Sequence, residues 1–147
     1  MVDQTTQRIV VGASPTRTWE VLTDFERYPV WAHDLKTVNI DEHDDDGRGT
    51  LVTYRAAGMG RSTSYSLRYD YSKAPAVLAW ELDEGDITRR LDGEYELHPV
   101  NGSPHQTEVV YHLSVELVVP LPGFVKRRAE ARIVHTALSQ LRDHLER

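Results

Sequence analysis

The chain has 147 residues, the length of one domain, and 17 Lys and Arg against 23 Asp and Glu give a formal net charge of −6. This acidic balance argues against a nucleic-acid-binding protein and against electrostatic docking on anionic lipid. The absence of Cys excludes disulfides, thiolate metal sites and a cysteine nucleophile. We therefore expect a single domain over residues 1–147.

The first third of the chain predicts a strand followed by helices. The β-prone run Ile9 to Val11 comes first. Ser14 and Pro15 then predict a helix start, because the serine hydroxyl accepts a free backbone N–H and proline has none to lose. This helix must end before Pro29, since the residue preceding a proline avoids the α region. A short second helix or turn carrying Trp31 is expected next.

Beyond Leu35 the pattern predicts strands separated by polar turns, in which apolar and polar residues alternate with a period of two. The alternating apolar positions are Tyr65, Leu67, Tyr69, Tyr71; Leu78, Trp80, Leu82; Leu91, Gly93, Tyr95, Leu97; and Val109, Tyr111, Leu113, Val115, Leu117. This alternation is typical of antiparallel strands with one apolar face and one solvated face. His112 falls on the outward face.

The last element is a predicted amphipathic helix of more than twenty residues that begins near Pro120 or Pro122. Its apolar stripe comprises Phe124, Ala131, Val134, Leu138, Leu141 and Leu145, with Arg128, Glu130, Arg142 and Asp143 outside it. A curved antiparallel sheet of six or seven strands supplies the long concave surface that such a stripe needs. The predicted fold class is α+β, with the sheet wrapped around this helix and two short helices after the first strand.

The first residues show no basic segment followed by an apolar core, and no run approaches the ~18 apolar residues of a membrane span. We therefore expect a cytoplasmic location.

Three motifs carry a resemblance to a known family: DFERYPVW at residues 24–31, LDGEYEL at 91–97, and VPLPG followed by KRRAE at 119–123 and 126–130. With the order of predicted elements, they resemble the START-like (SRPBCC) polyketide cyclase/dehydrase and lipid-transport superfamily, in its actinobacterial cyclase-like branch. The resemblance implies a helix-grip fold with an elongated apolar cavity between sheet and helix.

Aromatic residues with a polar group dominate the inner strand faces, and ten of the twelve aromatic rings in the chain are Tyr or Trp. We predict that a ligand cavity is lined by Trp31, Tyr65, Tyr69, Trp80, Tyr95 and Tyr111. An unpaired buried hydroxyl would cost about 1–3 kcal/mol, which a cavity holding water or a polar ligand group avoids. The alternative is that several hydroxyls reach the sheet rim and solvent.

Arg89 and His135 are the candidate polar residues of that cavity. Arg89 shares strand parity with Leu91 and Tyr95, so it is expected to point inward and to bind a carboxylate or enolate oxygen. His135 lies one residue off the helix stripe, where it could exchange protons. The structural alternatives are a strand-end arginine that reaches solvent and a boundary histidine.

The sequence predicts neither a metal nor an organic cofactor. The seven His occur singly, without a recognised ligand spacing. The acidic run Glu42 to Gly47 resembles a calcium loop but has Thr53 at the position of the bidentate Glu, so we expect a hairpin turn there.

The apolar segment Val118–Val125, followed by Lys126, Arg127 and Arg128, suggests either transient membrane contact or ordinary packing at the helix entrance. A monomer or a weak homodimer is expected.

Two functions remain open. The first is binding or transport of a hydrophobic or amphipathic small molecule, such as a lipid or polyketide-like compound, with Arg89 as polar anchor. The second is a cofactor-independent polyketide cyclase/dehydratase acting on a poly-β-ketone, with Arg89, a Tyr hydroxyl or His135 moving protons.

Overall fold

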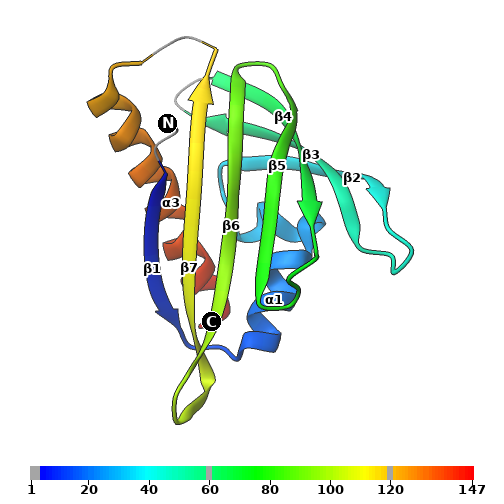
Figure 1. Ribbon diagram of the computed structural model, residues 1–147, viewed down its shortest axis with the longest axis vertical. Helices are drawn as coiled ribbons and strands as arrows, with labels where there is room; N and C mark the ends of the chain where they lie inside the picture. Colours follow the sequence, from blue (N-terminus) through cyan, green and yellow to red (C-terminus); the bar gives the residue numbers. More distant parts are fainter. Residues whose placement is uncertain (1–3, 59–60, 119–120) are drawn as a thin grey trace.

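A computed structural model describes residues 4–58, 61–118 and 121–147 (Figure 1). The strands are β1 (Thr5–Val11), β2 (Leu35–His43), β3 (Gly49–Gly58), β4 (Arg61–Asp70), β5 (Val77–Gly85), β6 (Thr88–Val100) and β7 (Ser103–Leu117). The helices are α1 (Pro15–Thr23), α2 (Tyr28–Trp31) and α3 (Gly123–Leu145), with a 3-10 turn, η1 (Phe25–Arg27), before α2.

The seven strands form one antiparallel sheet in the order β1-β7-β6-β5-β4-β3-β2. The sheet curves, and α3 lies along its concave side against β1 and β7 (Figure 1). This arrangement confirms the predicted fold, in which a curved antiparallel sheet wraps around a long C-terminal helix. No helix of the described ranges is both long and apolar enough to cross a membrane.

The predicted helix start at Ser14 is confirmed. The Ser14 hydroxyl accepts a hydrogen bond from the Arg17 N–H at 3.1 Å, and Pro15 is the first residue of α1. Helical turns resume after Thr23, and Pro29 lies in the first turn of α2, where a missing N–H costs no hydrogen bond. The short second helix carrying Trp31 is therefore also confirmed.

The apolar stripe of α3 differs from the prediction at two positions. Val134, Leu138 and Leu141 are buried as expected, but the Phe124 side chain is 64% exposed. Figure 1 shows the N-terminal turns of α3 extending beyond the start of β1. Glu130, expected outside the stripe, is only 1% exposed. It precedes Val134 by four residues, a spacing that places both on one helix face.

Candidate ligand-binding site

The six rings predicted to line a cavity belong to one hydrophobic core or pack against it. Trp80 is central, with ring centroids 5.3 Å from Tyr95, 5.8 Å from Tyr111 and 5.9 Å from Tyr69. The remaining rings continue the cluster through Tyr28 and Tyr54, in the contacts Tyr28–Trp31, Tyr28–Tyr54 and Tyr54–Tyr65. The rings therefore contact one another closely, and their role in lining a ligand cavity stays a prediction.

Gly93 makes room for the central indole. A Cβ atom at this position would lie 2.8 Å from Trp80 Cζ2 and 2.5 Å from the His112 carbonyl oxygen. Real side chains do not tolerate such distances, so any larger residue would displace Trp80 or the β7 backbone. The glycine of the LDGEYEL motif is thus explained by packing of the aromatic cluster.

The tyrosine hydroxyls of this cluster are hydrogen-bond donors rather than bases. Tyr54 and Tyr69 form a hydroxyl–hydroxyl bond of 2.5 Å. Burial raises the pKa of both groups well above the ordinary value near 10, and it raises the pKa of Tyr65 to about 12. At neutral pH these phenols are protonated, so they can donate to a ligand oxygen but cannot accept a proton as phenolates.

Arg89 does not point into the core as its strand parity predicted. The β6–β7 register shifts between Thr88 and Arg90, so one residue is inserted and the alternation of faces reverses there. Thr88 is buried and Arg89 is exposed as a result. The sequence carries no signal for this bulge.

A cavity of about 330 Å³ lies between α3 and the ends of β6 and β7, and Arg89 lines it. Its apolar wall includes Val115, Leu117, Leu121 and Ile133, and Lys126 adds a second cation. The volume is at the lower end of the range for small-molecule sites, about 300–1,000 Å³. The bulge thus removes Arg89 from the aromatic cluster but leaves it at a cavity between the sheet and the C-terminal helix.

Glu130, which is not among the site residues predicted from the sequence, also lines this cavity. Its Oε2 accepts the Val115 backbone N–H at 2.8 Å, and its Oε1 accepts a weaker bond of 3.4 Å from the Thr5 hydroxyl. Thr5 pairs with Leu113 at the first position of β1, so Val115 lies beyond the β1–β7 ladder. The carboxylate therefore satisfies a backbone donor that the ladder leaves free, and its signal was the helical spacing to Val134.

His135 is exposed on α3, and it is not among the described residues that line either cavity. The structure therefore brings Arg89, but not His135, to the space between helix and sheet. The segment Val118–Val125 includes two positions, 119 and 120, outside the described residues. Of its other members, Val118, Leu121, Phe124 and Val125 are exposed large apolar residues.

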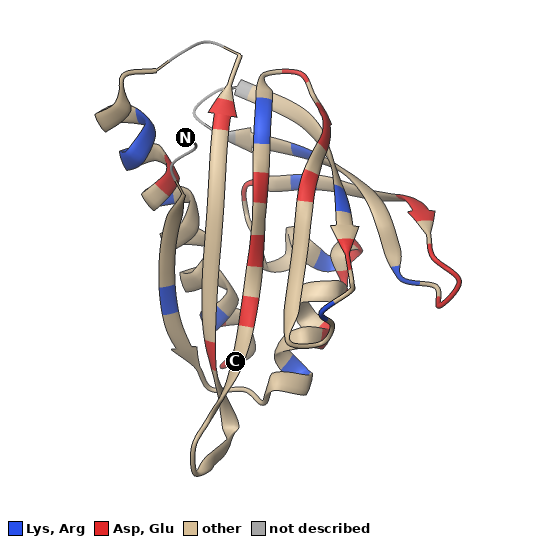
Figure 2. Cartoon of the chain, viewed as in Figure 1, with Lys and Arg blue, Asp and Glu red and all other residues tan. Residues whose placement is uncertain are grey.

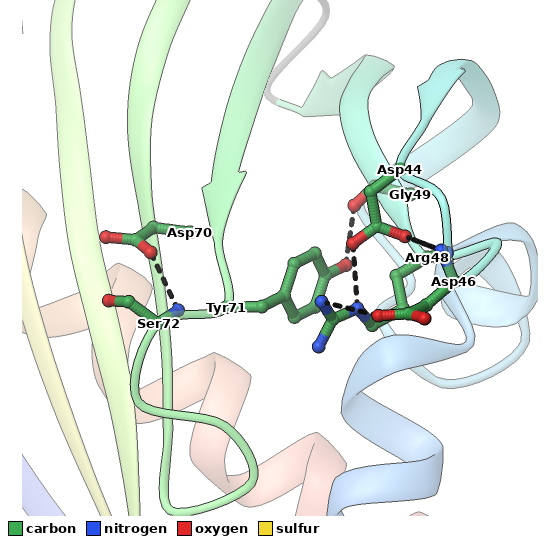
Figure 3. Close-up of polar contacts among 7 residues, drawn as sticks. All are labelled: Asp44, Asp46, Arg48, Gly49, Asp70, Tyr71 and Ser72. Carbon is green, nitrogen blue, oxygen red and sulfur yellow. Dashed lines mark hydrogen bonds and ion pairs between the residues drawn. The ribbon is translucent and has the colours of Figure 1, made fainter.

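A larger polar hollow of about 710 Å³ is bordered by Tyr69, Trp80 and many charged side chains. One end is closed by the β2–β3 turn, where Arg48 pairs with Asp44 at 2.8 Å and lies 4.5 Å from the centre of the Tyr71 ring. Figure 3 shows Tyr71 pointing toward this turn, and its hydroxyl donates to the Gly49 carbonyl oxygen. The acidic run is therefore a hairpin turn, as predicted, held by Arg48.

A family model described as polyketide cyclase/dehydrase and lipid transport matches residues 3–146. No curated protein matches the chain significantly. A START superfamily protein from Mycobacterium smegmatis superposes with a TM-score of 0.91 at 22% identity, covering 97% of both chains.

Two further solved structures share the fold. The Zhui aromatase/cyclase from Streptomyces sp. R1128 has a TM-score of 0.82 at 18% identity, covering 100% of this chain and 95% of its own. The protein TTHA0849 from Thermus thermophilus has a TM-score of 0.77 at 18% identity, covering 97% of both chains.

Proposed function

Because the chain belongs to the polyketide cyclase/dehydrase and lipid transport family, we propose that it binds a hydrophobic or amphipathic small molecule between α3 and the sheet. The observation that carries this proposal is the 330 Å³ cavity there, with a mainly apolar wall and the cations Arg89 and Lys126. This lining suits a ligand with an apolar body and an anionic or carbonyl end.

Burial in this cavity supplies the binding energy. An apolar ligand surface of about 200 Å² contributes about 5 kcal/mol when it leaves water, at about 25 cal/mol per Å². Arg89 and Lys126 are partly solvated, so their contribution is smaller than that of a buried ion pair and mainly fixes the ligand's orientation.

An anilinonaphthalene sulfonate probe, which combines fused apolar rings with an anionic group, tests the site by fluorescence. We expect Arg89→Gln to weaken probe binding about three- to tenfold, which corresponds to the loss of one charge-assisted contact. Arg55→Gln is the matched control, because Arg55 is exposed on β3 and lines neither cavity among the described residues. Equal affinity in both variants would argue against Arg89 as the anchor.

The apolar wall is tested separately with Ile133→Asp, which places a charge beside the bound ring system. Ile133 is already half-exposed on α3, so the fold should tolerate the change. Val30→Asp on α2 is a matched control at a similarly exposed apolar position. Probe binding that survives Ile133→Asp as well as it survives Val30→Asp would contradict the proposed cavity.

The cavity also favours a second candidate, a cofactor-independent polyketide cyclase/dehydratase. The specific observation is the Glu130 carboxylate, which lines the cavity together with Arg89 and Lys126 and so places a base near two cations. If the chain is such an enzyme, the wild type should convert a poly-β-ketone surrogate, and Glu130→Gln should abolish this conversion. If the wild type converts nothing, this candidate fails while the binding proposal stands.

The proposal includes a cytoplasmic location and a monomer or weak homodimer. It also includes transient membrane contact through Val118–Val125, which the exposed side chains of Leu121 and Phe124 support.

A further inference from the structure

Glu94, Glu96 and His112 meet on the outer face of the sheet, away from α3. Tyr95 and Leu97 of β6 point into the core, so the alternating residues Glu94 and Glu96 point outward. His112 is the direct β7 partner of Glu94. Each residue is half-buried, and one ligand atom from each lies within 4.8 Å of the others.

The imidazole of His112 is held in one orientation. Its Nδ1 lies 2.7 Å from the hydroxyl of Thr6, its direct β1 partner, and its Nε2 contacts the Glu96 carboxylate. Against the Glu96 carboxylate Nε2 carries the imidazole proton; an ion that replaces this proton would bind the Nε2 lone pair while Nδ1–H donates to Thr6. A second polar group that fixes the imidazole in this way is the usual partner of a metal-binding histidine.

The described residues around Glu94 and Glu96 do not fully neutralise the negative charge of these two carboxylates. Glu94 forms no hydrogen bond or ion pair with any residue that the structure describes, and Glu96 contacts only the imidazoles of His98 and His112. Figure 2 shows acidic residues, coloured red, following one another along β6. Two adjacent carboxylates repel each other, which favours a bound cation.

The cluster is open to a ligand from solution. Glu94 also borders the polar hollow of about 710 Å³. Its β5 neighbour is Ala79, whose small side chain leaves space beside the carboxylate. An ion can therefore enter from the hollow and keep solvent on its open side.

We propose that Glu94, Glu96 and His112 form a binding site for a divalent transition-metal ion of the Zn²⁺ type. One imidazole and two carboxylates suit such an ion better than Ca²⁺ or Mg²⁺, which prefer oxygen ligands alone. Ligand bonds of about 2.0–2.2 Å in a tetrahedral site require ligand atoms roughly 3.3–3.6 Å apart. Glu94 has no hydrogen-bond or ion-pair partner among the described residues, so rotation of its side chain can bring the carboxylate to this distance. The β6–β7 pairing keeps the backbone in place.

The test uses the full chain, freed of metal with a chelator and dialysed. A Zn²⁺ titration monitored by calorimetry should show one ion bound per chain. The bound ion should also raise the melting temperature. Co²⁺ should bind with the visible absorption of a low-coordinate ion. We expect Glu94→Gln to weaken Zn²⁺ binding at least about tenfold, since it removes a ligand. It should leave the melting temperature of the metal-free chain unchanged, because Glu94 has no described partner.

Two matched controls keep the result specific. Glu81→Gln changes a neighbouring acidic residue of the same hollow, and His105→Asn changes another β7 histidine, so both should bind Zn²⁺ like the wild type. His112→Asn should lose binding. The proposal is overturned if no ion binds at about 100 μM Zn²⁺, or if Glu94→Gln and His112→Asn both bind within twofold of the wild type.

Discussion

Glu130 is a carboxylate whose fully buried position requires partners. Burial of an ionised carboxylate without hydrogen bonds is strongly unfavourable. Here the Val115 N–H and the Thr5 hydroxyl both donate to it, so the charge is partly offset. The same bonds join α3 to the point where the β1–β7 ladder stops, and they fix one wall of the ligand cavity.

Glu130→Ala should therefore lower the free energy of unfolding by about 1–3 kcal/mol, because the Val115 N–H would be left buried without an acceptor. Urea denaturation measures the change. Glu20→Ala on α1 is the control, since Glu20 is exposed and should change stability by no more than about 0.5 kcal/mol. Equal effects of the two substitutions would show that Glu130 has no structural role.

Single residues are also where sequence-based prediction fails. Because Glu130 is charged, the sequence predicts it outside the apolar stripe of α3, although its spacing to Val134 places it inside. The backbone N–H that makes its burial possible belongs to Val115, on a strand that packs against the helix. Strand parity predicts that Arg89 lies in the core, but a register shift in β6 leaves it exposed at the rim of the cavity beside α3. Both outcomes depend on contacts between elements far apart in the chain, which local pattern does not record.

At the level of elements, local sequence patterns are sufficient to predict most of the strands and the start of α1. The period-two alternation identifies the strands from β4 to β7, because each strand has one face on the core and one in solvent. Ser14 and Pro15 identify the start of α1 for a reason that needs no tertiary contact. The extent of α3 covered by the sheet is not predictable, since it depends on where β1 begins.

Ser14→Ala should destabilise the protein by about 0.5–2 kcal/mol, through loss of the hydroxyl that accepts the Arg17 N–H. Ser14→Asp retains an acceptor and should stay within a few tenths of a kcal/mol of the wild type. Chemical denaturation monitored by circular dichroism compares the two variants. A Ser14→Asp variant as unstable as Ser14→Ala would show that the cap bond does not stabilise α1.

At the scale of the whole molecule, β6 and β7 contribute side chains with distinct roles to both faces of the sheet. Their inner side chains belong to the aromatic cluster and the cavity wall, and their outer side chains include the proposed metal ligands.

Burial raises the pKa of all seven tyrosines above the ordinary value: Tyr28, Tyr54, Tyr65, Tyr69, Tyr71, Tyr95 and Tyr111.

The raised tyrosine pKa values predict cooperative unfolding in alkali. Below pH 10 the folded and unfolded chains both keep these protons, so the contribution to stability is fully present. Above pH 10 the unfolded chain loses protons that the folded chain retains. The free energy of unfolding then falls by about 1.4 kcal/mol per pH unit for each such tyrosine. The loss continues until the pH passes the folded pKa values, which for Tyr65 and Tyr71 are about 12. A typical stability of about 5–15 kcal/mol would be lost within one or two pH units.

Tyrosinate absorbance and far-ultraviolet circular dichroism, recorded together during an alkaline titration, measure this unfolding. We expect the two signals to change in one steep step above pH 10. The chain in denaturant is the control, in which the tyrosines should titrate gradually around pH 10. Tyr95→Phe removes one of the titrating groups and should make the step less steep. Gradual titration near pH 10 with an unchanged dichroism signal would contradict the prediction, because it would mean that the folded chain leaves the phenols open to water.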